Sequence, residues 1–246
     1  MSIRNLILAL LAAAYVVMWV GGVGSHTFFD GPPADAYWAA PLFLFLAGFI
    51  VIVTTGAPVW SGLFVILVSG FVLEIVGVRY GFLFGKYIYT DALRPKLFGV
   101  PLVMASAWLV VTAYVKQMLM ILKLSGWLEI LSAALWMTAI DLVIDPLASG
   151  ILDYWRWSDG GVYYGVPTHN FVGWFAVSLI IFAIIKGFKW QANLWACHVG
   201  LSIILFFSTI ALAEGLLLAG GLGVALSIAH LIVLSSSYRK QTRFRK

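Results

Sequence analysis

The chain has 246 residues, of which 63 % are hydrophobic and only 10 % are charged. Soluble domains carry about 25 % charged residues, so this composition excludes a soluble globular protein and predicts an all-α polytopic membrane protein. The net charge of +5 does not indicate nucleic-acid binding, because the basic residues lie beside apolar stretches and in the final tail.

Eight stretches are apolar enough to cross a bilayer, which takes about 20 residues of helix. They are expected at Asn5–Val23, Tyr37–Thr55, Val59–Val78, Val100–Leu122, Trp127–Ala148, Phe171–Lys186, Ala192–Ala213 and Leu216–Ser235. Eight spans are expected, with seven as the alternative, and the sixth stretch is short. No long linker interrupts the chain, so residues 1–246 are treated as one integral membrane domain.

The distribution of Lys and Arg predicts the orientation. With the N-terminus inside, ten of these residues lie on the cytoplasmic side and five on the other. This excess predicts that both termini are cytoplasmic, in a multi-pass protein of the inner cell membrane. Lys116, Lys123, Lys186 and Lys189 are expected to extend to the cytoplasmic interface. A cleaved signal peptide ending near Gly24 is the alternative for the first stretch.

Two long loops, Arg79–Gly99 and Ser149–Asn170, are predicted to lie on the same side of the membrane. Both are rich in Tyr and Trp. An interfacial aromatic belt is the simplest explanation for such residues. It explains less well why they gather on one face while the cytoplasmic loops lack them.

Three acidic residues are predicted inside the spans, beneath these loops. Glu74 lies near the end of the third stretch, and Asp141 and Asp145 lie near the end of the fifth. Glu74 and Asp145 should be roughly 5–10 Å below the same face, and the two aspartates, four residues apart, should project from nearly one side of their helix. Ionisable groups in a membrane usually face a cavity or a partner. The structural alternative pairs Glu74 with Arg79, or Asp145 with Arg156.

Pro146 follows Asp145 directly and cannot donate a hydrogen bond to the carbonyl of Leu142. Proline also disfavours helical geometry at the residue before it. A kink at Asp145 is therefore expected, with the Leu142 carbonyl freed towards the cavity.

The motifs between Glu74 and Trp174 resemble the carotenoid-biosynthesis family of membrane 1',2'-hydratases. The first half of the resemblance rests on Glu74, Gly81-x-x-x-Gly85-x-Tyr87-x-Tyr89, Gly99-Val100-Pro101 and Trp108. The second half rests on Asp141-x-x-x-Asp145-Pro146, Trp155-x-Trp157, Tyr163-Tyr164-Gly165-Val166-Pro167 and Asn170-Phe171-x-Gly173-Trp174. The flanking helices match the family only in hydrophobic character.

The resemblance implies that water is added across the terminal double bond of an acyclic carotenoid end group, giving a tertiary alcohol. The substrate would be lycopene, γ-carotene or a bacterioruberin precursor, and neither a redox cofactor nor a metal is expected. The implied partners are the carotenoid, water, the lipid bilayer and other enzymes of the carotenoid pathway.

Hydration of such a double bond begins with protonation, which creates a tertiary carbocation. A carboxylic acid in an apolar site can remain protonated near neutrality, and Asp141 or Asp145 is the expected acid. Glu74 would orient or deprotonate the water. The aromatic faces expected to stabilise the cation belong to Trp155, Trp157, Tyr163 and Trp174. The other expected substrate-binding residues are Arg79, Tyr87, Tyr89, Tyr164 and Asn170.

Two other functions are compatible with the sequence. Asp141-x-x-x-Asp145 resembles half of the Asp-rich signature of intramembrane prenyltransferases, but no second Asp pair has that spacing. Magnesium dependence would distinguish such an enzyme from a hydratase. A non-catalytic lipid or polyene transporter would place acids near the midplane and contain an inverted repeat, and neither feature is evident here.

Overall fold

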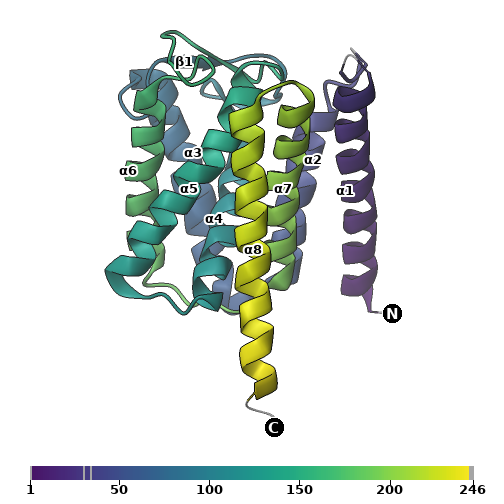
Figure 1. Ribbon diagram of the computed structural model, residues 1–246, viewed down its shortest axis with the longest axis vertical. Coiled ribbons are helices and arrows are strands. Elements are labelled where there is room, and N and C mark those ends of the chain that lie inside the picture. The colour runs from purple at the N-terminus through teal and green to yellow at the C-terminus, as the bar shows by residue number, and fades with distance from the viewer. Residues whose placement is uncertain (1, 30, 34, 244–246) are drawn as a thin grey trace.

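The computed structural model describes residues 2–29, 31–33 and 35–243, with side chains up to residue 236. In this part of the chain eight α-helices form an up-and-down bundle (Figure 1). They are α1 (Ile3–Phe28), α2 (Ala39–Thr54), α3 (Trp60–Tyr80), α4 (Val103–Ile121), α5 (Gly126–Ser149), α6 (Thr168–Ile185), α7 (Leu194–Ala213) and α8 (Leu217–Arg243). A 3₁₀ turn, η1 (Ala57–Val59), precedes α3. Among the described residues, seven helices are long and apolar enough to span a membrane, and α2, with 16 residues, is shorter. The all-α polytopic membrane fold is thereby confirmed.

Several helix ends differ from those predicted, and two of these differences have local causes. α4 begins at Val103, because Val100–Pro101 forms strand β3, which pairs with β2 (Lys96–Leu97). α6 begins at Thr168, directly after Pro167. Pro167 is the N-cap residue and its backbone is extended, with ψ of 136°, so the helix begins at the next residue.

Both ends of the described chain lie at the same end of the bundle, opposite the loops that contain strand β1 (Figure 1). The two termini therefore lie at one end of the bundle, as the predicted topology requires. That this side is the cytoplasm stays a prediction. Residues 244–246 of the basic tail lie outside the described residues, and the side chains of the tail before them are not described.

The core of the bundle is built around α4, which is the most buried of the seven spans. Its side chains pack against α2, α3, α5 and α7. In contrast, α1 packs only along one side, against α2 and α7, and leaves most of its surface exposed. The bundle is therefore an assembly of helices around α4, with α1 at its margin.

A buried ion pair joins α4 to α5 at the end opposite the loops. Lys116 bonds to Glu129, and both side chains are less than 10 % exposed. The ammonium also lies 5.7 Å from the centre of the Trp190 ring. The prediction that Lys116 extends to the interface is therefore wrong, because it has an anion and an aromatic face inside the protein. Lys123, Lys186 and Lys189 are exposed as expected.

A hydrogen-bond network beside this ion pair joins α4 to the start of α7 and the end of α2. The Gln117 amide nitrogen donates to the Gln191 carbonyl (3.0 Å), and its oxygen accepts from the Asn193 backbone (2.9 Å). The Asn193 side chain then donates to the hydroxyls of Thr54 (3.1 Å) and Thr55 (2.9 Å). Its oxygen also caps α7. These bonds fix one end of the bundle.

Replacing Glu129 tests how much the buried ion pair stabilises the protein. Glu129→Ala leaves the Lys116 charge buried without its partner, so we expect the free energy of unfolding to fall by about 3–5 kcal/mol. The measurement is the thermal unfolding midpoint in detergent. Asp159→Ala, at an exposed acid, serves as the control, and the double variant K116M/E129L should recover much of the loss. An unchanged midpoint in Glu129→Ala would contradict the assignment.

Reporter fusions test the orientation. A green fluorescent protein fused to the C-terminus should fluoresce in a bacterial host, because it folds in the cytoplasm. Alkaline phosphatase inserted at Gly160, in the exposed loop before α6, should be active because that side faces outward. The reverse pattern would show that the chain is inserted the other way.

Candidate active site

The two aromatic loops meet above the ends of α3 and α5 and pair as a small antiparallel sheet. Strand β1 (Tyr87–Tyr89) pairs with strand β4 (Trp155–Trp157). Successive side chains of a strand point to opposite faces. The first and third residues of both strands therefore face the bundle, while the middle ones, Ile88 and Arg156, face outward and are exposed. We call this two-stranded sheet the aromatic lid.

Glu74 lies on α3 beneath the lid, and its carboxyl group accepts three hydrogen bonds. Oε2 accepts from the hydroxyls of Tyr87 (2.6 Å) and Tyr89 (2.8 Å), and Oε1 accepts from Trp108 Nε1 (2.9 Å). Burial, followed by the neighbouring Glu74 carboxyl, raises the pKa of Tyr87 and Tyr89 well above the ordinary tyrosine value. Both tyrosines therefore remain donors at neutral pH.

Asp141 and Asp145 lie one turn apart on α5 and share a single amide group. The Asn170 Nδ2 nitrogen, in the first turn of α6, donates to Oδ2 of Asp141 (2.7 Å) and to Oδ2 of Asp145 (2.6 Å). The other oxygen of Asp145 accepts from the ring nitrogens of Trp155 (2.8 Å) and Trp157 (3.2 Å). The lid therefore supplies donors to acids on both α3 and α5.

Two glycines on α3 leave the space that the groups around Glu74 occupy. A Cβ atom at Gly70 would lie 2.5 Å from the ring of Trp108. A Cβ atom at Gly77 would lie 2.8 Å from Phe84 and 3.0 Å from the Tyr87 hydroxyl. Side chains at these positions would displace two of the three donors to Glu74.

A cavity of about 30 Å³ lies between the acids and the lid. It is lined by Glu74, Phe84, Tyr87, Tyr89, Met104, Asp141, Asp145, Trp155, Trp157, Asn170 and Trp174. A polar space of this size holds a single water molecule. The Trp108 and Trp174 rings stack beside it with their centres 4.4 Å apart. Within the described ranges, no three His, Cys, Asp or Glu side chains are grouped in a way that could hold a metal ion.

Most of the predicted site residues come together at this cavity. The nine that line it are Glu74, Tyr87, Tyr89, Asp141, Asp145, Trp155, Trp157, Asn170 and Trp174. Three others lie away from it. Tyr163 donates to the Leu142 carbonyl at 3.0 Å. Tyr164 accepts from the Leu218 backbone at 3.0 Å, and the exposed Arg79 lies over the ring of Tyr80.

Neither ion pair of the structural alternative forms. Arg156 bonds instead to Asp153 through two nitrogens, at 2.6 and 2.7 Å, and these bonds hold the pKa of Asp153 below its ordinary value. Glu74 is bonded to tyrosine and tryptophan rather than to Arg79. Polar but uncharged donors therefore surround the buried acids, so no arginine has to be buried with them.

The prediction about Pro146 is confirmed in part. The proline lies inside α5, which continues to Ser149, and the carbonyl of Leu142 is free of its helical partner as expected. However, this carbonyl accepts the Tyr163 hydroxyl and so is satisfied by the second loop.

Three residues next to the acids are missing from the predicted set. Trp108, Phe84 and Met104 contact Glu74 or line the cavity. Trp108 belongs to the recognised motif and is the one tryptophan of α4, which could have indicated it. Phe84 and Met104 have no chemical signal in the sequence, because only the packing of the loop on α3 and α4 brings them here.

Comparisons with known proteins identify the family of the chain. Over 120 residues the chain is 32 % identical to the bisanhydrobacterioruberin hydratase of Haloarcula japonica. That alignment covers 45 % of the chain and 40 % of the relative, so the match spans less than half of either protein. No solved structure matches the chain. The family model described as "Carotenoid biosynthesis protein" matches residues 38–235, which is most of the chain. The chain therefore belongs to the carotenoid biosynthesis protein family.

Proposed function

We propose that this protein hydrates the terminal (1',2') double bond of an acyclic carotenoid end group in the inner cell membrane. The observation that carries the proposal is the water-sized cavity bordered by three buried acids and an aromatic lid. Membership of the carotenoid biosynthesis family supports a carotenoid substrate, such as lycopene, γ-carotene or a bacterioruberin precursor. The name of the Haloarcula relative supports hydration as the reaction.

Asp141 is the proton donor in this proposal. Two carboxyl groups that share one amide nitrogen repel each other when both are ionised, so the Asp141–Asp145 pair retains a proton. Both oxygens of Asp145 accept hydrogen bonds, whereas among the described residues only Oδ2 of Asp141 does so. Oδ1 of Asp141 is therefore free to transfer its proton to C2' of the double bond, which leaves a tertiary cation at C1'.

The cavity water completes the reaction. It attacks the cation at C1' and releases a proton, which the Glu74 carboxylate accepts. That proton returns to Asp141 through the next water, so the overall reaction consumes only the alkene and one water. The Trp174 side chain borders the cavity, and in this scheme its ring stabilises the cation, since a desolvated cation–π contact contributes about 2 kcal/mol or more. No redox cofactor takes part in this scheme.

The isoprenoid end is larger than the cavity, so the reacting end enters only when a wall moves. Trp174 of α6 lines the cavity and stacks on Trp108 of α4, so in this proposal these two rings are the wall that moves. Their displacement would open a path for the polyene from the hydrocarbon phase. The remainder of the chain would then lie in the bilayer.

Replacing each aspartate by its amide tests the proton donor. Asp141→Asn and Asp145→Asn should lower turnover by roughly 100-fold or more, because an amide cannot supply the proton. The measurement is liquid chromatography–mass spectrometry of pigments from a bacterial host that makes lycopene and γ-carotene. The wild type should add one water to a pigment and leave its polyene absorption unchanged.

Asp153→Asn is the matched control, because Asp153 is bonded to Arg156 outside the cavity and asparagine tolerates its positive φ of 48°. This variant should retain wild-type turnover. Wild-type turnover in both Asp141→Asn and Asp145→Asn would refute the acid assignment. A gain of whole isoprene units would instead indicate a prenyltransferase.

Removing single donors of the lid tests whether it positions the acids. Tyr87→Phe and Trp157→Phe each remove one hydrogen bond to a buried carboxyl group. We expect turnover to fall about ten-fold or more, since bonds to charged groups contribute about 1.5–3 kcal/mol. Tyr164→Phe removes a hydroxyl from the same pair of loops, but outside the cavity, and should leave turnover unchanged. Equal turnover in all three variants would show that the lid has no positioning role.

A further inference from the structure

The second aromatic loop contains a tight turn between β4 and α6, at residues 161–166. The backbone nitrogens of Gly161 and Gly165 each donate to the carbonyl of the other, at 3.1 and 3.2 Å. The Val166 nitrogen donates to the Tyr163 carbonyl at 2.9 Å. A Cβ atom at Gly161 would lie 1.8 Å from the Val166 carbonyl oxygen, so a side chain does not fit there. The turn is therefore held together by its own backbone, and Tyr163 is part of it.

The Tyr163 side chain extends from this turn to α5, where its hydroxyl donates to the Leu142 carbonyl at 3.0 Å. That carbonyl lies between the two aspartates in the sequence and has no donor within the helix, because Pro146 lacks an N–H. Burial, followed by the neighbouring Tyr164 and Asp141, raises the pKa of Tyr163 to about 12. The hydroxyl is therefore a donor at neutral pH, and it satisfies a carbonyl that the proline leaves without a partner.

The same turn leads into Asn170, the residue that bridges the two aspartates. Pro167 follows the turn, and its carbonyl accepts from the Asn170 backbone nitrogen at 3.0 Å. The Tyr163 ring packs edge-on against Phe171, with the ring centres 5.7 Å apart. The Asn170 side chain then donates to both aspartates, at 2.7 and 2.6 Å. These contacts form a closed ring, which runs from α5 through Tyr163 to the start of α6 and returns to α5 through Asn170.

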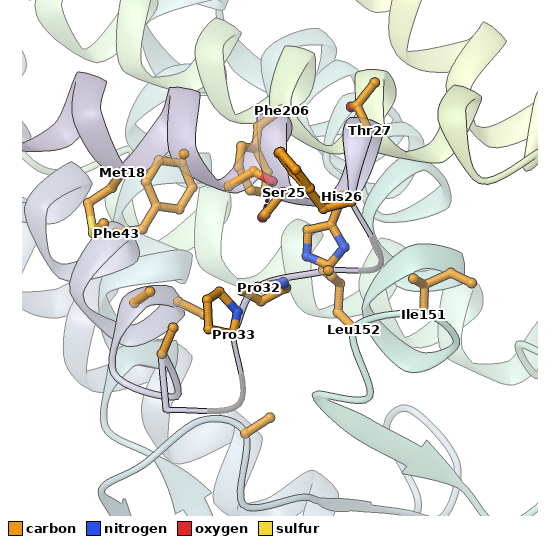
Figure 2. A pocket seen from close by; sticks show the side chains of 18 of the residues that line it. Met18, Ser25, His26, Thr27, Pro32, Pro33, Phe43, Ile151, Leu152 and Phe206 are labelled. Atoms are coloured by element: carbon orange, nitrogen blue, oxygen red, sulfur yellow. Dashed lines mark hydrogen bonds between the residues drawn. The ribbon is translucent and has the colours of Figure 1, made fainter.

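The other side of the α5 end borders a large cavity of about 980 Å³, which lies between α1 and the rest of the bundle. Ile151 and Leu152, in the turn after α5, line this cavity (Figure 2). It shares no lining residue with the 30 Å³ cavity at the acids, which we call the acid cavity. The end of α5 is therefore packed on the side of α6 and the second loop, and it borders open space on the side of α1.

We propose that Tyr163 is a positioning residue for the aspartate pair. It does not line the acid cavity. Its bond to the Leu142 carbonyl holds the turn on α5 and so keeps the Asn170 amide where it bonds to both carboxyl groups. A buried carbonyl without a donor is costly, so loss of the hydroxyl would move the turn relative to α5. The effect on turnover rests on the proposed function, whereas the effect on the two carboxyl groups does not.

The first test removes the hydroxyl alone. Tyr163→Phe keeps the ring against Phe171 and loses the bond to Leu142. Tyr164→Phe is the matched control, because it removes the neighbouring hydroxyl, which accepts from the start of α8. Turnover is measured per folded protein, so a loss of stability alone does not change it. We expect Tyr163→Phe to lower turnover about ten-fold or more, since small displacements of reacting groups lower rates steeply. Tyr164→Phe should retain the wild-type value.

The second readout needs no substrate. The infrared stretching bands of a carboxyl group, protonated or ionised, shift when the group loses a hydrogen bond. The bands of the aspartate pair are those that purified full-length protein, in an ester-free detergent, loses in Asp141→Asn and Asp145→Asn. Tyr163→Phe should shift these bands, because the Asn170 amide moves away from the two carboxyl groups. In Tyr164→Phe they should stay at their wild-type positions.

A rescue experiment tests whether the hydroxyl acts through the carbonyl. Pro146→Ala returns an N–H to α5, and this group can donate to the Leu142 carbonyl within the helix. The double variant Y163F/P146A should therefore recover much of the wild-type turnover and the wild-type infrared bands.

Three results would overturn the proposal. They are wild-type bands in Tyr163→Phe, equal effects of Tyr163→Phe and Tyr164→Phe, and no recovery in the double variant. If the wild type hydrates no carotenoid and the bands still shift in Tyr163→Phe alone, the positioning role stands and the proposed reaction fails.

Discussion

Three carboxyl groups inside a membrane-spanning bundle need hydrogen-bond donors, and much of the architecture at the loop end supplies them. An unpaired polar group in an apolar interior costs several kcal/mol, and an unpaired charge costs more. Glu74 receives two tyrosine hydroxyls and an indole, and Asp145 receives two indoles and an amide. None of these donors carries a charge. The acids are therefore stabilised without a buried arginine or lysine, and their proton remains available for chemistry.

The opposite end of the bundle solves the same problem in another way. There, Lys116 and Glu129 form a direct ion pair. Gln117 and Asn193 hydrogen-bond to each other and to groups at the ends of neighbouring helices. That network fixes the positions of the helices, and its carboxyl group is paired with a buried positive charge. The two ends of one bundle thus differ, since one end neutralises its acid with a lysine and the other surrounds its acids with uncharged donors.

Hydrophobic stretches predicted the helices well, because about 20 apolar residues in succession have few alternatives to crossing the bilayer. The grouping of Glu74, Asp141 and Asp145 beneath the loops also followed from helical rise and spacing. The lid did not, although Tyr87-x-Tyr89 and Trp155-x-Trp157 alternate with the period of a strand. Strands of three residues are too short to stand out, and only the folded bundle brings these loops together. For the same reason the partner of Lys116 could not be read from the sequence.

The register and pairing of the two lid strands decide which side chains lie over the acids. β1 and β4 pair through only three residues each, and one strand provides the donors to Glu74 while the other provides donors to Asp145. A shift of one residue in either strand would turn its aromatic side chains outward and bring Ile88 or Arg156 over the acids. Separating the strands would strip donors from both carboxyl groups at once and admit solvent. The lid therefore controls the access of water to acids on two different helices. Water reaches both of them or neither.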